Sequence, residues 1–477
     1  MRLLGFIAFI FLVGCKHEPE QQAYADYPAE IGEIMLTKCA VSGCHNDASR
    51  EAAAGLSLAS WDRLFEGSSQ NAAVVPYRAD QSILMYFINT FSDLGPAISP
   101  TMPFNSEALG KHDVIKIRDW INKGAPDENG NIKFSDNPDR QKYYVLNGKC
   151  KMVAVFDAAT DRIMRYINIS GKANDFVESI RVTPDGEYWC VLLTTGKLLK
   201  YNATTDTYSG ELILGNGLWR GLEFTNSGNA IVCNYSGKSN YSGGELVVAD
   251  VNTWQITHRF NAVNDSIYFP QHCLYFSNHY YATCNQGNFI YKLNAEGVTK
   301  IKLNPLDELK FNDNTYRPGS IAYSSLHHKY MVACTRSNEV RVFNADTDEL
   351  EKVIQVGNFP NEMLITDNLL WVTCTEDIES FPGNKGAVFA IDLNTMQVLK
   401  KLDVGYQPKG LTYNPYKQII LIANRNADPV GADKPHHYSG CEGNNGYITA
   451  IDVNQLEVIK GFKAEVSVDP YSISFRN

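Results

Sequence analysis

After residue 142 the chain shows short apolar runs rich in Val, Ile, Tyr and Phe, separated by turns containing Gly, Asn or Asp. Such runs predict β-strands, because these side chains favour extended backbone and the turn residues favour tight reversals. Seven runs end in Asp or Asn and lead through a small turn into a second run, at Asp157, Asn202, Asp250, Asn294, Asn344, Asp392 and Asp452. The number of residues from one of these positions to the next is close to the length of a four-stranded propeller blade. Residues 142–477 are therefore predicted to form an all-β, seven-bladed propeller.

The two ends of this repeat complement each other. The first unit lacks an innermost strand, and the chain finishes on an apolar run at 471–475. We expect this last strand to complete the first blade and to close the ring, which removes an open sheet edge.

The first part of the chain has a different period. Ile31, Ile34 and Met35 share one helical face, and further helices are predicted over 61–66, 82–89 and 113–122. We therefore expect a small, mainly-α domain at 29–127 and a linker at 128–141. The predicted fold class is a multidomain protein, with this domain followed by the propeller.

The N-terminus is typical of an exported protein. Arg2 precedes an apolar run from Leu3 to Val13, which is too short to span a bilayer and fits a signal peptide. The run ends in Leu-Val-Gly-Cys, which resembles a bacterial lipobox with Cys15 as the lipidated residue. The sequence thus predicts a signal peptide at 1–14, a lipidated tether at 15–28, and attachment to a bacterial membrane on its periplasmic or cell-surface side.

Net charge and cysteine positions limit the classes of partner and the pairing of the cysteines. A net charge of −10 disfavours nucleic acid as a partner. Of the eleven cysteines, five recur at similar places in successive blades and are expected to be buried and unpaired, namely Cys190, Cys233, Cys284, Cys334 and Cys374. Cys150, Cys273 and Cys441 receive no partner from the sequence.

The candidate chemistry begins at Cys39 and Cys44, which are followed directly by His45. Two thiols and a neighbouring imidazole are the groups that attach a c-type haem and ligate its iron. The usual spacing has two residues between the cysteines, whereas this chain has four. A zinc site completed by His112 or by an acidic residue, and a Cys39–Cys44 disulfide, are the alternatives.

A second iron ligand is expected far along the same domain. Met102 lies between Pro100 and Pro103, where an extended backbone can present its thioether. His–Met ligation suits electron transfer. His112 is the second choice and is more typical of an exposed residue near a helix start, whereas Met85 lies in an apolar helix and is expected in the core.

Both parts of the chain resemble known families. The first resembles the cytochrome c domains of planctomycetes and Bacteroidota, on the Cys39–His45 segment, Gly55-Leu56-Ser57-Leu58, Val75-Pro76 with Ser82-Ile83-Leu84, Met102-Pro103, and Trp120-Ile121-Asn122-Lys123-Gly124-Ala125. The second resembles YVTN-type propellers, on Phe269-Pro270-Gln271-His272 and Gln407-Pro408-Lys409-Gly410. The first resemblance implies one covalent haem c.

The propeller offers a second candidate site. Loops that enter the innermost strands place Arg220, His272, Arg317 and Lys409 around one rim. A long loop on the same face carries His436 and His437. His272, Arg317, His436 and His437 are the candidate catalytic residues if the propeller binds an anionic substrate, a metal or a second cofactor.

The sequence leaves three functions open. The first is a membrane-anchored c-type cytochrome that passes single electrons to a redox partner protein, with the propeller as a docking or substrate-binding platform. The second is an oxidoreductase whose reaction takes place on a small molecule in the propeller funnel while the haem relays electrons. A binding lipoprotein without turnover is a third possibility.

Overall fold

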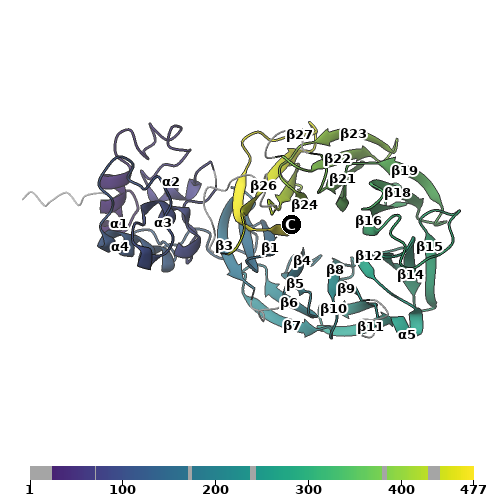
Figure 1. Ribbon diagram of the computed structural model, residues 1–477. Helices are drawn as coiled ribbons and strands as arrows, with labels where there is room; N and C mark the ends of the chain where they lie inside the picture. Colours follow the sequence, from purple (N-terminus) through teal and green to yellow (C-terminus); the bar gives the residue numbers. More distant parts are fainter. Residues whose placement is uncertain are drawn as a thin grey trace, which may run out of the picture.

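The computed structural model describes residues 24–69, 71–169, 175–236, 243–378, 384–427 and 441–476. Within these ranges the chain forms a helical first part beside a closed ring of sheets (Figure 1). The predicted signal peptide, Cys15, His436 and His437 lie outside the described residues. No helix in the described ranges combines the length and the apolar character needed to cross a membrane.

The helical part contains four α-helices joined by irregular segments. They are α1 (Ala29–Ile34), α2 (Trp61–Glu66), α3 (Ile83–Ile88) and α4 (Lys111–Asn122). A π-helical turn, Met35–Cys39, continues α1, and 3₁₀ turns cover Ala79–Gln81 and Ser92–Leu94. The four predicted helices are therefore present, with boundaries shifted by a few residues.

Seven antiparallel sheets form the ring, and each has four strands in radial order; the last sheet also contains β28 (Ala464–Val468). The innermost strands, which contact one another around the axis, are β29 (Pro470–Arg476), β4 (Val177–Val182), β8 (Trp219–Phe224), β12 (Pro270–Phe276), β16 (Pro318–Ser324), β20 (Pro360–Thr366) and β24 (Pro408–Asn414). The second strands are β1 (Lys142–Asn147), β5 (Tyr188–Leu193), β9 (Asn229–Asn234), β13 (His279–Cys284), β17 (Lys329–Cys334), β21 (Leu369–Cys374) and β25 (Ile419–Asn424).

The third strands carry the Asp or Asn repeat at their ends: β2 (Met152–Asp157), β6 (Lys197–Asn202), β10 (Glu245–Asp250), β14 (Phe289–Asn294), β18 (Glu339–Asn344), β22 (Ala387–Asp392) and β26 (Asn445–Asp452). The outermost strands are β3 (Arg162–Asn168), β7 (Tyr208–Ile213), β11 (Gln255–Asn261), β15 (Gly297–Lys302), β19 (Leu350–Gln355), β23 (Gln397–Leu402) and β27 (Glu457–Val458). A short helix, α5 (Ala262–Asp265), follows β11. Blades are numbered 1 to 7 in chain order of their second strands.

The predicted propeller and its closure are confirmed. The C-terminal strand β29 pairs with β1, with Tyr144 opposite Ser474 and Val145 opposite Ile473. Blade 1 is thus built from both ends of the repeat, and each of the seven blades has an innermost strand within the described residues.

The burial of each strand follows its radial position. The second strands β1 and β25 are buried at every residue, because neighbouring blades cover both of their faces. Outermost strands such as β7 are largely exposed and mixed in polarity. This is why the central runs of each repeat are continuously apolar in sequence and the last runs are not.

The recurring Asp or Asn has a local structural role. In each blade its side-chain oxygen accepts hydrogen bonds from backbone N–H groups two or three residues later. Asp250, for example, accepts from Asn252 and Thr253 at 2.7 and 3.0 Å. The residue therefore fixes the reversal between the third and fourth strands.

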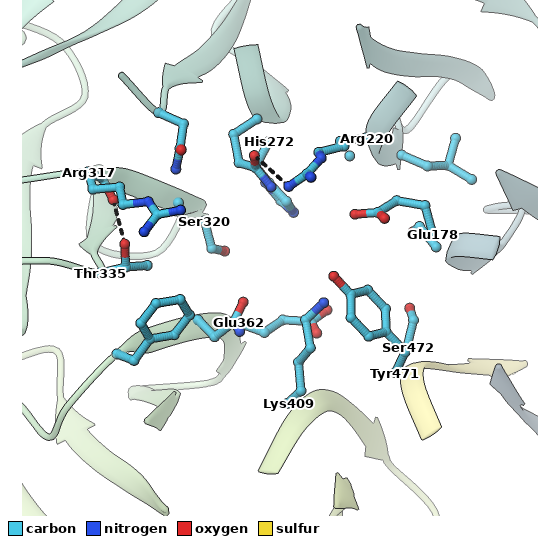
Figure 2. A pocket seen from close by; sticks show the side chains of 18 of the residues that line it. Glu178, Arg220, His272, Arg317, Ser320, Thr335, Glu362, Lys409, Tyr471 and Ser472 are labelled. Atoms are coloured by element: carbon cyan, nitrogen blue, oxygen red, sulfur yellow. Dashed lines mark hydrogen bonds between the residues drawn. The ribbon is translucent and has the colours of Figure 1, made fainter. Parts of the chain in front are cut away.

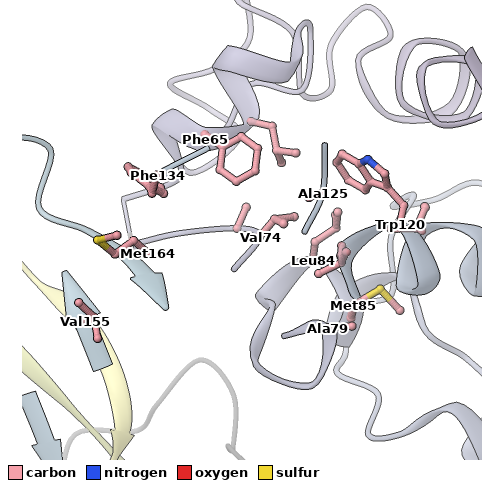
Figure 3. Close-up of a cluster of buried hydrophobic side chains, with 14 of the residues drawn as sticks. Phe65, Val74, Ala79, Leu84, Met85, Trp120, Ala125, Phe134, Val155 and Met164 are labelled. Atoms are coloured by element: carbon pink, nitrogen blue, oxygen red, sulfur yellow. The ribbon is translucent and has the colours of Figure 1, made fainter. Parts of the chain in front are cut away.

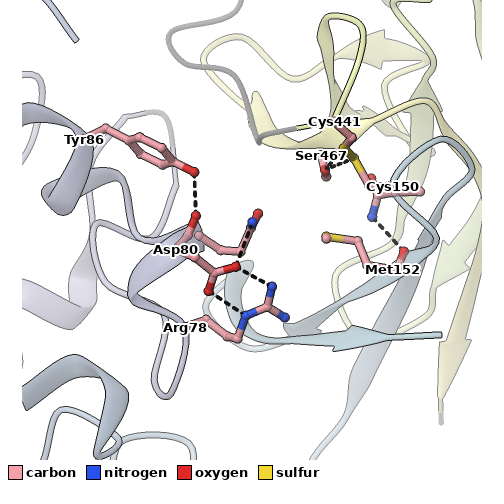
Figure 4. Close-up of a disulfide and its surroundings, with 9 residues drawn as sticks. Arg78, Asp80, Tyr86, Cys150, Met152, Cys441 and Ser467 are labelled. Atoms are coloured by element: carbon pink, nitrogen blue, oxygen red, sulfur yellow. Dashed lines mark hydrogen bonds and ion pairs between the residues drawn. A yellow bond between two sulfur atoms is a disulfide. The ribbon is translucent and has the colours of Figure 1, made fainter. Parts of the chain in front are cut away.

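The cysteines divide as expected, with one correction. The five blade cysteines are buried and free, as is Cys273. Cys150 and Cys441, which the sequence left without partners, form a disulfide with a Cα–Cα distance of 5.7 Å (Figure 4). The two residues are 291 positions apart, and the closure of the ring brings blades 7 and 1 together.

The helical part packs against the outer edge of blade 1. Asn71 accepts a hydrogen bond from the backbone N–H of Ile163 at 2.9 Å and donates one to the carbonyl of Asp161 at 3.1 Å. Arg162 donates to the carbonyl of Glu66 at 2.7 Å. The first of these bonds satisfies a backbone N–H of β3 that a free sheet edge would leave to solvent.

Apolar contacts continue across this junction. Phe65 and Val74 of the helical part, Phe134 of the predicted linker and Met164 of β3 belong to one buried cluster (Figure 3). That cluster also reaches Trp189 in blade 2. The structure thus shows the propeller plainly, whereas the predicted cytochrome c domain is not evident as a separate helical fold, because its core is shared with the blades.

Candidate functional site

The Cys39–His45 segment forms a compact loop at the end of the π-helical turn. The backbone N–H of His45 donates to the carbonyl of Cys39 at 3.0 Å, and Cys44 donates to Val41 at 3.0 Å. Leu58 then donates to the carbonyl of His45 at 2.8 Å. The four residues between the cysteines therefore form a turn, which the hydrogen bond from His45 to Cys39 closes.

The ring of His45 is oriented by the following segment. Its Nδ1 lies 3.4 Å from the carbonyl oxygen of Leu56, which can only accept a hydrogen bond. Burial lowers the pKa of His45, against the opposing effect of this hydrogen bond. A neutral ring with its proton on Nδ1 keeps a lone pair on Nε2, which is the tautomer that metal-ligating histidines use.

The two thiols are free and differ in exposure. Cys39 is buried and Cys44 is half-buried, and they do not form the disulfide considered as an alternative. Burial, followed by the neighbouring Cys44, raises the pKa of Cys39 to about 11. No group of three or more His, Cys, Asp or Glu side chains in the described ranges gathers as a metal site, so the zinc alternative has no support from the structure.

Met102 packs against the buried cluster that joins the helical part to blade 1. Its backbone N–H donates to the carbonyl of Phe87 at 2.8 Å, which ties its loop to α3. Its half-buried side chain packs against the cluster that contains Cys39. Met85 is buried in α3 and His112 is exposed in the first turn of α4, as expected.

These donors fit a c-type haem chemically. Two unpaired thiols, an imidazole whose Nδ1 faces a carbonyl and a half-buried thioether in the same helical part are groups that can hold such a cofactor. When bound, the haem would supply a one-electron redox centre.

The second candidate site lies on the propeller axis, where the innermost strands begin. Each of the seven strands has an irregular register near its start. In β12, for instance, pairing passes from Pro270–Cys284 to Cys273–Ala282, so Gln271 and His272 face one residue. Such a β-bulge turns consecutive side chains toward the same side.

Threonines of the second strands hold these bulges in place. The hydroxyl of Thr283 accepts from the N–H of His272 at 3.1 Å and donates to Gly319 of the next blade at 2.7 Å. Thr373 does the same between Glu362 and Lys409, with both distances 3.0 Å. The bulges are thus coupled from blade to blade.

The bulged residues line a cavity of about 190 Å³ on the axis (Figure 2). Most of its lining comes from the two residues that follow the first residue of each innermost strand. This set is Glu178, Ser179, Arg220, Gly221, Gln271, His272, Gly319, Ser320, Asn361, Glu362, Lys409, Tyr471 and Ser472. Gly221 has φ +58, and a Cβ there would lie 2.6 Å from the carbonyl oxygen of Gln271.

One ion-pair cluster crosses the cavity wall. Arg181 binds Glu223 at 2.8 Å and Glu362 at 3.1 Å. Nε2 of His272 lies 3.6 Å from the same Glu223 oxygen. Burial lowers the pKa of His272 to about 4, although Glu223 opposes the shift, so this histidine is neutral near pH 7.

Three further cations face the cavity outside that cluster. They are Arg220 of blade 3, Arg317 at the start of blade 5 and Lys409 of blade 7. Burial lowers the pKa of Lys409 to about 7, while Glu178 and Glu362 act in the opposite direction. Burial also raises the pKa of Glu178.

The structure therefore brings together four residues that the sequence placed on one rim, including the candidates His272 and Arg317. His436 and His437 lie outside the described residues. Sequence reasoning missed Glu178, Arg181, Glu362 and Tyr471. Glu178, Glu362 and Tyr471 share one signal, a place just after the start of an innermost strand, whereas Arg181 lies near the end of β4. Only the bulges reveal that the start of each innermost strand faces the axis.

Comparisons with known proteins add little to this geometry. No family model matches the chain, and no curated protein is significantly similar to it. Similar solved structures include dihydro-heme d1 dehydrogenase NirN in complex with DHE, at 13% identity over 72% of this chain and 76% of that chain, with a TM-score of 0.46. Another is a protein of unknown function from Bacteroides caccae, at 10% identity over 71% and 99%, with a TM-score of 0.40. Such low values carry no information about function, and the propeller assignment rests on the seven sheets themselves.

Proposed function

We propose that this protein is an exported c-type cytochrome that transfers single electrons to or from a partner protein. One haem c would be attached through Cys39 and Cys44, with His45 and Met102 as the iron ligands. The observation that carries the proposal is the contact between Nδ1 of His45 and the Leu56 carbonyl beside two free thiols. This contact leaves Nε2 available to a metal.

The residues around the haem would each have a defined task. The thiols would hold the macrocycle, and the Leu56 carbonyl would fix the imidazole plane. The loop of Met102, tied to Phe87, would set the position of the thioether. The cluster shared with blade 1 would exclude water from one side and fix the haem relative to the propeller.

Export and membrane attachment belong to the same proposal. A disulfide between Cys150 and Cys441 is expected to persist only in an oxidising compartment. Lipidation at Cys15 would then hold the protein at a bacterial membrane, on the periplasmic or cell-surface side, within reach of redox partners.

The test is the haem content of protein matured in a host that attaches haem to this wider spacing. A pyridine haemochrome spectrum of the full chain should show one covalent c-type haem. Cys44→Ser should retain haem through one thioether, with an absorption band at longer wavelength, and Cys39→Ser/Cys44→Ser should retain none covalently. Absence of covalent haem from the unmodified chain, in a host proven on another protein of this spacing, would refute the proposal.

A second candidate is an oxidoreductase with its reaction in the axial cavity. It is favoured by one observation, the neutral His272 beside the Arg181, Glu223 and Glu362 cluster. His272→Gln should then abolish turnover while leaving the haem spectrum unchanged. Unaltered turnover would remove His272 from any catalytic role and leave the propeller as a binding platform.

A further inference from the structure

We propose that the axial cavity binds a small organic polycarboxylate, held by Arg220, Arg317 and Lys409. The three cations come from blades 3, 5 and 7, so they approach the cavity from alternate blades. Figure 2 shows side chains from the surrounding strands pointing toward one central space. This inference does not depend on the haem proposal, because it concerns a different part of the chain.

None of the three cations forms an ion pair with a carboxylate within the part of the chain that the structure describes, although Glu178 and Glu362 raise the pKa of Lys409 against the effect of burial. Arg220 contacts the Gln271 side chain at 3.5 Å and the ring of Tyr235, and its buried Nε has no hydrogen-bond partner among the described residues. Lys409 lies over the ring of Tyr471. A buried guanidinium N–H without an acceptor is costly, and an anionic ligand would supply the acceptor.

The other charged groups explain why the ligand is an anion. Arg181 pairs with both Glu223 and Glu362, so this cluster carries one excess negative charge. Glu178 adds a second negative charge, and the three cations leave the described part of the cavity with an excess of one positive charge. A cationic cavity inside a chain of net charge −10 concentrates a field that draws small anions and repels cations.

The volume of the cavity and the placement of its cations on separate blades favour a ligand with several carboxylates over a single phosphate. At roughly 10–15 Å³ for each water-sized group, a cavity of about 190 Å³ accommodates on the order of a dozen non-hydrogen atoms. Phosphate has five and would leave much of this space unfilled. Guanidinium groups bind carboxylates through two parallel hydrogen bonds, and donors on separate blades suit a ligand with carboxylates on more than one arm.

The polar rim can complete the recognition. Gln271, Ser320 and Asn361 also line the cavity, and such groups can bind hydroxyl or carboxylate oxygens. The buried Nδ1 of His272 likewise has no partner. A hydroxylated tricarboxylate such as citrate therefore matches the available groups better than a simple aliphatic acid.

The experiment is isothermal titration calorimetry of the full-length protein with citrate, succinate, acetate and inorganic phosphate at fixed ionic strength. We expect citrate to bind at least tenfold more tightly than acetate or phosphate, with succinate between them. Equal, weak binding of all four anions, or no binding, would overturn the proposal whatever the haem content.

Variants locate the site. Arg220→Gln and Arg317→Gln should each weaken citrate binding tenfold or more. Lys400→Gln is the matched control, because Lys400 is a partly exposed lysine on the outermost strand β23, away from the axis, that pairs with Glu457 at 3.6 Å. Arg317 is itself exposed, so its variant is expected to fold, which the melting temperature checks. Citrate affinity unchanged in a folded Arg317→Gln variant would overturn the assignment.

Discussion

The carbonyl oxygen of Leu56 lies 3.4 Å from Nδ1 of His45. This relationship connects two motifs that are separate in sequence, the cysteine–histidine segment and Gly55-Leu56-Ser57-Leu58. In the second motif, the Leu56 carbonyl faces the His45 ring, and the Leu58 N–H donates to the His45 carbonyl. This segment is therefore the support that orients the candidate ligand.

With the proposed haem bound, His45→Ala should remove the low-spin spectrum of the mature protein, because the iron would lose its imidazole ligand. Covalent haem should remain in the fraction that matures. Absorption spectra of the oxidised and reduced protein check this outcome. His112→Ala, which changes an exposed histidine, is the control and should leave both spectra unaltered; the reverse result would transfer the ligand role to His112.

Met102→Ala should lower the reduction potential and leave the haem attached, since loss of a thioether ligand favours the ferric state. Met85→Ala should instead cost about 2–5 kcal/mol of folding free energy through a buried cavity, with the potential nearly unchanged. Redox titration and thermal unfolding separate the two variants. A potential that does not move in Met102→Ala would exclude Met102 as a ligand.

The Cys150–Cys441 disulfide should stabilise the ring closure. Removing a native disulfide costs about 2–5 kcal/mol, and this one spans 291 residues of chain. Cys150→Ser/Cys441→Ser should therefore lower the melting temperature. A thiol reductant should lower it for the unmodified protein but not for the variant; equal sensitivity of both would mean that the bond does not form.

Phe134 should secure the helical part to blade 1. Its ring packs edge-on against Phe65 with centroids 6.2 Å apart, and it is only 8% exposed. Phe134→Ala should cost about 3–5 kcal/mol and expose the junction to limited proteolysis before the propeller itself is cleaved. Phe104→Ala, at a side chain that is 58% exposed, should have little effect on either measurement.

Lys409 should destabilise the free protein below neutral pH. Its folded-state pKa of about 7 lies below the ordinary lysine value, so the folded state releases a proton that the unfolded chain keeps. Stability should then rise as pH increases from about 7 towards the unfolded value. The groups that face Lys409 and set this balance are Glu178, Glu362, Arg425, Asp469 and Tyr471.

Lys409→Met tests this balance. The substitution should raise the melting temperature at pH 6 and lose that advantage as pH rises above 7, because the unmodified lysine becomes neutral there. It should also weaken citrate binding at pH 6. The measurement is the melting temperature of both proteins across this pH range. An increase in melting temperature that is the same at every pH would show that burial of the lysine charge is not its source.

Local chain properties determined much of this protein. Apolar runs ending in Asp or Asn predicted seven blades, because each such residue closes its own turn through bonds to backbone groups two or three residues away. Helical periodicity predicted α1 to α4, because packing on one face needs only the spacing of apolar side chains. The residues of the cysteine–histidine segment are likewise close neighbours in sequence.

The tertiary structure decided what depends on distant parts of the chain. Cys150 and Cys441 became partners only when β29 paired with β1 and joined blade 7 to blade 1. Glu178 and Glu362 came to face the same axis because bulges in β4 and β20 turn them inward, the second of which is held by Thr373. A bulge depends on how two paired strands fit, and a cavity on how seven blades meet, and neither is written in the spacing of residues along the chain.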